Sequence, residues 1–408
     1  MSTNIPTRFQ DPREARDFTM KLLGMFIIDG DPTPSQSEIE RMSRALTESD
    51  DLADAVVTDF KALAPGESWR LLNQALDSGI ESVKEAPESL QALFAQLDKV
   101  PAWVDFELAD HASVVAQRTS FFGEFILSCV SLMGGYRSSA ANKPIAMTGA
   151  LTYNARRRLA ETSQFTYNVT RAGAMRRHSQ GFKEAVKVRF MHAFVRNKLK
   201  HSSEWRADEW GEPINQADLV GTNLLFSLVF LMGLRLVGFR FDERDSLATM
   251  HLWRYIGYVM GISEELLPAD EEAAQRLAYL IGNSQPGADA DSLALGQALM
   301  NVPFEQAETP AEQFLAFLEM HYRSGLSRLV LGDQAGDDLG LPNTPLKYAP
   351  LLTTPLIFTA ETIRMMVPGL TDIIANLGES WQSGRIKSMI GDNPAQFRPP
   401  AEAMRATA

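Results

Sequence analysis

Cysteine is almost absent from this chain of 408 residues, in which Cys129 is the only one. A single thiol cannot form a disulfide within the chain, so no internal disulfide stabilises the fold. Cys129 lies in the apolar run 125–130, where a reduced thiol behaves as a small hydrophobic side chain. We therefore expect Cys129 to be a buried hydrophobic residue.

Positive charge is also scarce. The chain has 39 Lys and Arg residues against 51 Asp and Glu residues, which gives a formal net charge of −12 and a pI near 5.1. General binding to a phosphate backbone needs an accumulated basic surface. Nucleic acid is therefore not expected as a partner.

Long hydrophobic runs are missing as well. The longest, Leu219–Leu234, has about 16 residues and ends before Arg235, short of the roughly 20 that cross a bilayer. We predict a buried helix here and no transmembrane span. Peripheral contact with a membrane stays open, because an enzyme that acts on a lipid-like substrate must collect it from an apolar phase.

A secretory signal is not evident at the N-terminus. Residues 1–18 carry charges and prolines where such a signal has an uninterrupted apolar region, and they contain no twin-arginine pair. We expect the chain to start here and to stay in the cytoplasm.

The motifs of several enzyme classes are absent too. The sequence contains no HExxH, GxSxG, Walker A or GxGxxG motif, so zinc proteases, α/β-hydrolases and the standard nucleotide-binding folds are not expected. It also lacks the paired Glu-x-x-His motifs of di-iron bundles. Five scattered histidines have no second ligand at metal spacing and are expected to be structural or exposed: His111, His178, His201, His251 and His321.

What the chain does have is helical periodicity, with few alternating β-branched runs. We therefore predict an all-α fold. Ser37 to Glu40 forms a capping-box pattern that predicts one helix start. Further helices are expected over 67–81, 88–97, 310–331 and 358–366.

Loops and turn-rich segments divide the chain. Residues 100–105 read as a loop, and residues 282–289 are rich in turn-forming residues. We predict four parts: an N-terminal helical extension packing on the core (1–100), a catalytic core (101–281), C-terminal helices that complete the core (282–391) and a loose tail (392–408).

The sixth histidine, His192, has a distinctive setting in the segment VRFMHAFVR, residues 188–196. On a helix that turns about 100° per residue, Arg189, His192 and Arg196 project within roughly 60° of one another. A neutral imidazole can ligate iron through Nε2 while a carbonyl holds its Nδ1–H, and arginine forks suit haem propionates. The pattern indicates a haem site. The alternative is an amphipathic helix with a hydrogen-bonded core histidine and solvated arginines.

A second segment lies upstream, at residues 154–165, with the sequence NARRRLAETSQF. Its Arg158 and Thr162 are one helical turn apart and share a face. Together with His192, in this order and spacing, they resemble the catalytic domain of the rubber oxygenase and MpaB-type oxygenase family, which includes latex clearing proteins. The resemblance covers roughly residues 101–280 and continues through 213–222, 252–261 and Pro268.

The resemblance implies a fold, a cofactor and residue roles. In the family the matched helices form a globin-like core around one b-type haem, and His192 falls at the position of the proximal iron ligand. Arg158 and Thr162 fall on the distal side, where a guanidinium and a hydroxyl can hydrogen-bond dioxygen. Arg189 and Arg196 also match, as partners of the haem propionates or as braces of the helix.

Two departures from the family pattern concern the reaction. Glu161 stands where family rubber oxygenases carry a lysine, and Asn142 stands where they carry a glutamate proposed as a base. An amide cannot accept that proton. Glu161 lies three residues from Arg158 and could replace the missing carboxylate. The alternative is an exposed glutamate that pairs with Arg157 or Arg158 outside the pocket.

The leading interpretation is a cytoplasmic, haem b-dependent oxygenase with dioxygen as co-substrate. The resemblance implies cleavage of a C=C bond to aldehyde and ketone ends in an apolar isoprenoid, terpenoid or lipid-like substrate. One alternative is a haem protein without turnover, such as a gas or redox sensor, which the loss of the base at Asn142 favours. Another is a peroxidase-like haem enzyme, against which the lack of a distal histidine counts. The sequence does not indicate an oligomeric state.

Overall fold

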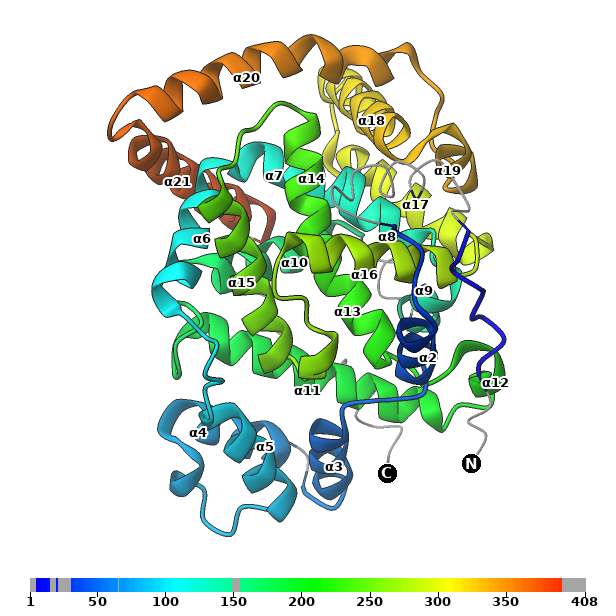
Figure 1. Cartoon of the computed structure of the whole chain (residues 1–408), viewed down its shortest axis with the longest axis vertical. Helices are drawn as coiled ribbons and strands as arrows, with labels where there is room; N and C mark the ends of the chain where they lie inside the picture. Colours follow the sequence, from blue (N-terminus) through cyan, green and yellow to red (C-terminus); the bar gives the residue numbers. More distant parts are fainter. Residues whose placement is uncertain (1–4, 15–19, 21–30, 65, 149–154, 391–408) are drawn as a thin grey trace.

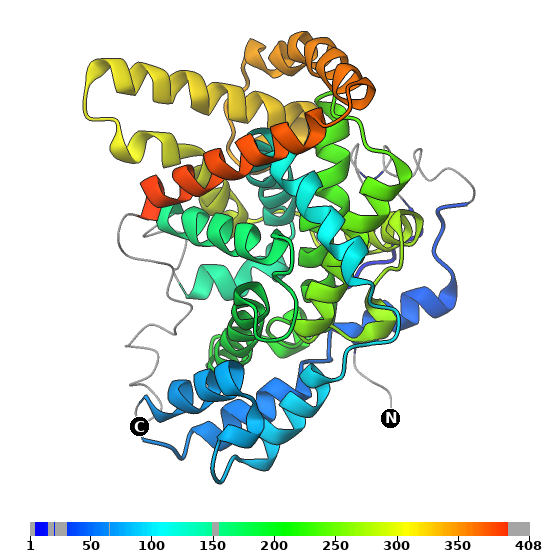
Figure 2. The same cartoon turned by 90° about the vertical axis from the view of Figure 1, so that its left-hand side faces the viewer.

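The computed structural model describes residues 5–14, 20, 31–64, 66–148 and 155–390, and all regular secondary structure in these ranges is helical. The predicted all-α class is confirmed. Figure 1 shows the helices packed in several directions around the centre of the molecule, and Figure 2 shows the same arrangement from the side.

The helices of the N-terminal segment are α2 (Gln36–Ala45), α3 (Asp51–Phe60), α4 (Glu67–Ser78), the 3₁₀ turn η1 (Ile80–Ser82) and α5 (Glu88–Asp98). Helices α3, α4 and α5 lie together at one end of the molecule (Figure 1). Phe60, Trp69 and Phe94 belong to the same buried cluster as Phe190 of α11 (Gln180–Lys200). The N-terminal helices therefore share a hydrophobic core with the central ones.

The first capping box lies two residues earlier than predicted. The hydroxyl of Ser35 accepts a hydrogen bond from the backbone N–H of Glu38, whose carboxylate accepts one from the N–H of Ser35. Ser35 has the extended backbone, with φ −68° and ψ 159°, that an N-cap requires. Ser37 already lies inside α2, so the predicted box at Ser37 to Glu40 is wrong.

The central helices run to residue 284. They are α6 (Phe106–Arg118), α7 (Ser120–Ile126), the π-helix η2 (Leu127–Leu132), α8 (Met133–Tyr136), α9 (Ser139–Met147), α10 (Ala155–Thr170), α11, α12 (Ala207–Trp210), α13 (Gln216–Phe226), α14 (Leu228–Leu236), α15 (Glu243–Val259), η3 (Glu264–Leu266) and α16 (Glu271–Ser284).

The C-terminal helices follow. They are α17 (Ala290–Asn301), η4 (Val302–Gln306), α18 (Pro310–Leu331), α19 (Asp333–Asp338), η5 (Pro345–Tyr348), α20 (Ala349–Met366) and α21 (Leu370–Ile390). The predicted helices over 88–97 and 310–331 are confirmed, and the one over 358–366 is the second half of α20. Helix α18 starts where expected because Thr309 caps it in a capping box with Glu312.

The longest apolar run forms α13 and α14, which meet at Ser227. Gln216–Leu236 has 21 residues and contains an 18-residue window with a mean hydropathy of 1.8, so it is long and apolar enough to cross a membrane by length and composition. The described run is therefore longer than the 16-residue run read from the sequence. About 56% of that window is buried inside the molecule, and the core helix of a soluble protein passes the same test of length and composition.

Helices α10 and α11 hold the predicted site residues and pack against each other. Helix α10 also packs on α21, and α11 packs on α3 and α15. The site residues therefore lie where the N-terminal, central and C-terminal helices meet.

Candidate active site

His192 lies in the middle of α11, and its Nδ1 is sealed from solvent. Within the described part of the chain this nitrogen has no hydrogen-bond partner. The carbonyl expected to hold Nδ1–H is therefore not provided by those residues. A buried polar atom without a partner costs free energy, about 1–3 kcal/mol, and calls for an explanation.

The environment of His192 keeps its imidazole neutral. Burial lowers the pKa of His192 to about 4, and the positive charges of Arg196 and Arg158 act in the same direction, while Asp50 opposes them. At neutral pH the ring therefore keeps a nitrogen lone pair. A neutral imidazole is the form that ligates a metal.

Arg189 is occupied by protein groups. Its Nε and Nη2 donate to the two carboxylate oxygens of Asp50 at 2.6 and 2.9 Å, and its Nη1 donates to Gln96 Oε1 at 2.7 Å and to the carbonyl of Val259. The side chain of Arg189 is 3% exposed. These contacts tie α11 to the N-terminal helices and to α15.

Arg196 is occupied in the same way. It forms an ion pair with Asp54 and donates to the carbonyls of Pro213 and Ile214, both at 3.1 Å. Its side chain is only 1% exposed. Of the two roles predicted for Arg189 and Arg196, these contacts favour bracing of the helix over pairing with a cofactor, and neither arginine is solvated.

On α10, Glu161 joins two arginines. Its carboxylate accepts from Arg157 Nε at 3.0 Å and from Arg158 Nη1 at 3.1 Å. Both arginine side chains are 47% exposed, and that of Glu161 is 15% exposed. The pairing predicted as the alternative for Glu161 is therefore present, and two guanidiniums share one carboxylate.

The hydroxyl of Thr162 donates to the backbone carbonyl of Arg158 at 2.9 Å. In this rotamer the hydroxyl proton is donated within α10, so the hydroxyl oxygen can act toward other groups only as an acceptor. Thr162 and Arg158 share a helical face as predicted, but the hydroxyl is not free to donate to another molecule.

Asn142 has a structural role. Its Nδ2 donates to the carbonyls of Tyr136 at 2.8 Å and Gly135 at 3.3 Å, and the residue is 5% exposed. The amide therefore closes the end of α8. No carboxylate stands at this position, in agreement with the departure noted in the sequence.

Two residues near the site carried no signal in the sequence. Tyr136 is buried beside Leu159 of α10, and burial raises the pKa of its phenol while the charge of Arg158 opposes that rise. Glu184 of α11 is 5% exposed and accepts from Asn168 Nδ2 and Gln180 Nε2, at 2.8 and 2.7 Å. Burial raises the pKa of Glu184. Both depend on tertiary contacts that a helical pattern does not encode.

Two cavities have been located in the described residues, and neither is lined by His192. The first, about 20 Å³, lies in the core beside Thr166 and Thr170 of α10 and has room for about one water molecule. The second is a groove of about 540 Å³ between α7, α18 and α21. No group of three or more His, Cys, Asp or Glu side chains in the described residues could hold a metal ion by itself.

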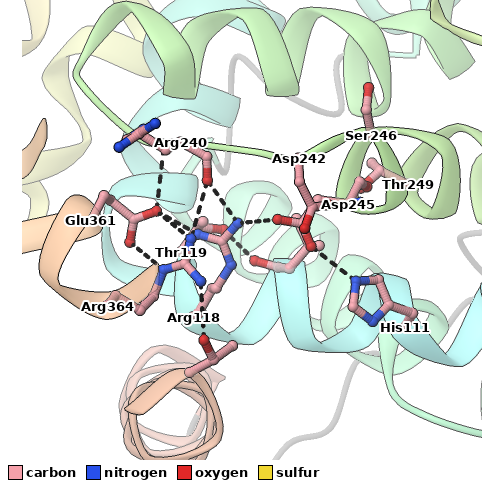
Figure 3. A network of polar contacts seen from close by, with 12 residues as sticks. His111, Arg118, Thr119, Arg240, Asp242, Asp245, Ser246, Thr249, Glu361 and Arg364 are labelled. Carbon is pink, nitrogen blue, oxygen red and sulfur yellow. Dashed lines mark hydrogen bonds and ion pairs between the residues drawn. The ribbon is translucent and has the colours of Figure 1, made fainter. Parts of the chain in front are cut away.

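A second polar cluster lies away from His192, between α6, α15 and α20 (Figure 3). Arg118 donates to Asp245 Oδ2 and Glu361 Oε2, both at 2.8 Å, and His111 contacts Asp245 Oδ1 at 2.9 Å. Arg364 pairs with Glu361 at 2.9 Å. We call these five residues the Arg118 network.

Comparisons with known proteins agree with one another. A family model described as "ER-bound oxygenase mpaB/B'/Rubber oxygenase, catalytic domain" matches residues 119–360. A curated rubber oxygenase from Streptomyces sp. (strain K30) is 24% identical over 322 residues, which is 77% of this chain and 74% of that protein. A solved structure of the latex clearing protein LCP in its closed state superimposes with a TM-score of 0.58, at 21% identity, and covers 89% of this chain and 90% of the other. The last likeness concerns the fold.

Proposed function

This chain belongs to the ER-bound oxygenase mpaB/B'/rubber oxygenase family, as its motifs predicted, and we propose that it is a haem b-dependent oxygenase that cleaves a C=C bond in an apolar unsaturated substrate. Membership of an oxygenase family supports the enzyme class. The observation that carries the haem assignment is the neutral imidazole of His192, whose buried Nδ1 has no hydrogen-bond partner in the described residues.

His192 would be the single protein ligand of a bound haem. A porphyrin supplies four nitrogen donors, so the protein need contribute only one, and a cluster of three ligands is unnecessary. His192 would ligate through Nε2, which leaves Nδ1 as the buried ring nitrogen without a partner in the described residues. When bound, the haem supplies the redox-active iron that reacts with dioxygen.

Arg158 is the proposed polar group for the oxygen chemistry. The positive charge of Arg158 lowers the pKa of His192, and within the described residues only its Nη1 is engaged, by Glu161. Its other donors can therefore hydrogen-bond dioxygen or an oxygen of the product. Glu161 acts as the positioning residue that orients this guanidinium. We place Thr162 beside it as a lining residue, because its proton is held by the Arg158 carbonyl.

The substrate is proposed to be a small isoprenoid, terpenoid or unsaturated lipid. One relative of this chain is a rubber oxygenase, but we keep the prediction that this chain works in the cytoplasm, where a rubber polymer is an awkward substrate. Asn142 cannot take a proton from the substrate, because it is an amide whose Nδ2 is bound to backbone carbonyls.

A haem protein without turnover is the second candidate. Two observations favour it: the absence of a carboxylate at Asn142, and the engaged hydroxyl of Thr162. A sensor needs a bound haem and a gas ligand but no base. The two candidates therefore agree on His192 and differ on turnover.

Oxygen consumption with a diene substrate tests the proposal. Arg158→Leu should lower turnover by about 10²–10³-fold, the effect of removing one preorganised donor. Arg157→Leu is the matched control, because both arginines are 47% exposed and both pair with Glu161, yet only Arg158 is close enough to affect His192. Haem binding without oxygen uptake in the wild type would favour the sensor, and hydrogen peroxide turnover on a phenol would favour the peroxidase-like enzyme.

A further inference from the structure

Helix α20 is oriented opposite to an ordinary surface helix, with its charged side toward the protein and its apolar side toward solvent. Its only charged side chains, Glu361 and Arg364, point inward and are 6% and 7% exposed. A stripe on the opposite side is apolar and open to solvent: Leu352, Leu356, Ile363 and Met366, which are 77%, 71%, 51% and 76% exposed. A surface helix of a soluble domain normally buries its apolar side and exposes its charges. We call these four residues the α20 stripe.

Polar contacts fix α20 in this orientation (Figure 3). Glu361 accepts from Arg118 at 2.8 Å and from the backbone N–H of Arg240 at 3.3 Å. Arg364 donates to the carbonyl of Arg240 at 3.3 Å. Turning the stripe inward would break these pairs and leave Arg118 buried with one carboxylate fewer. The stripe is therefore held outward by the Arg118 network.

The stripe runs along the length of α20, which lies across one end of the molecule (Figure 1). At 18 residues the helix is about 27 Å long. The side chains that flank the stripe are also uncharged and at least partly exposed: Leu351, Pro355, Phe358, Thr359 and Met365. The whole outer side of α20 is thus free of charge.

We propose that the α20 stripe docks the protein on an uncharged lipid surface, with α20 lying in the plane of the interface. A helix whose apolar side faces outward and whose polar side is satisfied by protein suits the boundary of an acyl layer. The Leu, Ile and Met side chains of the stripe can enter that layer without taking a charge with them, whereas Phe358 beside the stripe has the Arg240 guanidinium 5.0 Å from its ring centroid.

The absence of charge on the outer side of α20 favours an uncharged lipid layer over a second protein chain or an anionic membrane. Seams between helices of two chains usually carry charged residues at their flanking positions, and protein interfaces have a polar rim. The outer side of α20 has neither. An anionic membrane is disfavoured too, because the chain carries a net charge of −12 and the stripe offers no lysine or arginine.

The apolar surface continues from α20 toward the groove of about 540 Å³. Tyr322, which hydrogen-bonds Thr353 of α20, lines that groove together with Phe121, Phe125 and Trp381. The groove is also lined by charged side chains, Glu124, Glu319, Arg323 and Arg385. Leu318 of α18 also lines it and is 40% exposed. A lipid layer docked on the stripe would therefore end at this mixed aromatic and charged groove.

Flotation with phosphatidylcholine vesicles tests the proposal. The wild type should float with the vesicles, and the triple variant Leu352→Glu, Leu356→Glu, Met366→Glu should partition at least about tenfold less, because three charges would have to enter the acyl layer. The matched control is Leu247→Glu with Leu293→Glu, at two leucines that are 41% and 38% exposed on other helices and should float like the wild type. A wild type that stays in solution, or a triple variant that floats as well as the wild type, overturns the proposal.

Two further arms separate lipid from other occupants. Light scattering reports whether the stripe joins two copies: a wild-type dimer that the triple variant converts to a monomer, without flotation of either, overturns the lipid assignment. Replacing part of the phosphatidylcholine by phosphatidylglycerol should not strengthen binding. A strong increase that salt abolishes would point to a basic patch elsewhere and would also contradict the proposal.

A labelled cysteine gives a local readout. Since Cys129 is the single cysteine and is buried, Met366→Cys introduces one accessible thiol for an environment-sensitive dye. Its emission should shift to the blue with phosphatidylcholine vesicles, whereas the same dye at Leu247→Cys should not respond. Equal shifts at both positions would contradict docking through α20. None of these readouts depends on haem or turnover, so failure here is distinct from failure of the proposed function.

Discussion

The Arg118 network and the surroundings of His192 are two polar regions that differ in how far their buried groups find hydrogen-bond partners. In the network, Asp245 and Glu361 each accept from Arg118, although Arg118 Nε has no partner in the described residues. On α11, Nδ1 of His192 is buried without any partner there. Charges that are paired in this way fix how helices sit, whereas the buried, unpartnered ring nitrogen of His192 calls for another explanation, which we propose is a bound cofactor.

Two histidines sharpen the contrast. His111 lies at the edge of the network, 24% exposed at its side chain, with Nε2 held by Asp245 at 2.9 Å. His192 has positive neighbours in Arg196 and Arg158, and its ring is kept neutral by burial. The same residue type is thus a structural contact in one region and a candidate ligand in the other, and the partners decide which.

The largest expected effect is in the network. Arg118→Met leaves Asp245 and Glu361 in the interior with fewer partners, which should lower the free energy of unfolding by about 3–5 kcal/mol. Urea unfolding measures this loss. The matched control is Arg70→Met, because Arg70 is 58% exposed and pairs with Glu67 at the surface, so its loss should cost under about 1 kcal/mol. Equal effects of the two variants would show that the network does not hold the helices.

The next effect concerns Arg189. If it braces α11 through Asp50, Arg189→Met should destabilise the haem-free protein by about 3 kcal/mol, because it strands a buried carboxylate. Urea unfolding of the apo-protein, together with haem titration, separates the two predicted roles. An apo-protein of unchanged stability whose haem affinity falls would instead identify Arg189 as a partner of the propionates.

A pH dependence is expected from His192. The pKa is about 4 in the folded chain against 6.5 for the free side chain, so between these values only the unfolded chain takes up the proton. The free energy of unfolding should therefore fall by about 3 kcal/mol as pH drops from 6.5 to 4. His192→Leu removes this contribution. The difference in the free energy of unfolding between wild type and variant, measured in urea, should therefore change between pH 4 and 6.5 and become independent of pH above pH 7. A difference that does not change with pH would rule out a buried neutral imidazole.

The smallest effect is expected at Glu161. Its ion pairs with Arg157 and Arg158 involve half-exposed arginines, so Glu161→Gln should change the free energy of unfolding by less than about 1 kcal/mol. As a positioning residue it should lower turnover less than Arg158→Leu does. Thermal unfolding and oxygen uptake measure the two quantities. A loss of 10²-fold or more with a pH profile that loses its acidic limb would instead make Glu161 a base.

The sequence predicted those features of the fold that depend on residues close together in the chain. The bounds of α18 follow from the Thr309 capping box and from helical periodicity, and the position of His192 on a helix follows from its neighbours. The family was predicted from Arg158, Thr162 and His192 in their order and spacing, together with the segments 213–222 and 252–261, and was then confirmed by the match over 119–360.

Tertiary partners decided the rest. Asp50 and Asp54 lie 139 and 142 positions before Arg189 and Arg196, so the helical pattern gave no sign that these arginines are occupied. The first capping box was placed at the wrong serine because Ser35 and Ser37 both precede a glutamate by three residues. The inverted orientation of α20 depends on Arg118, which comes from a helix more than 200 residues earlier.

The central claim is that His192 is the protein ligand of a haem, and the visible spectrum tests it most directly. Wild type, His192→Ala and His321→Ala should be reconstituted with haem and assayed as pyridine haemochromes. His321 is the matched control because its Nδ1 is also buried without a partner in the described residues. The account predicts a Soret band and a b-type haemochrome in wild type and in His321→Ala and their loss in His192→Ala. A wild type that takes up no haem, or a His192→Ala spectrum equal to that of the wild type, would contradict it.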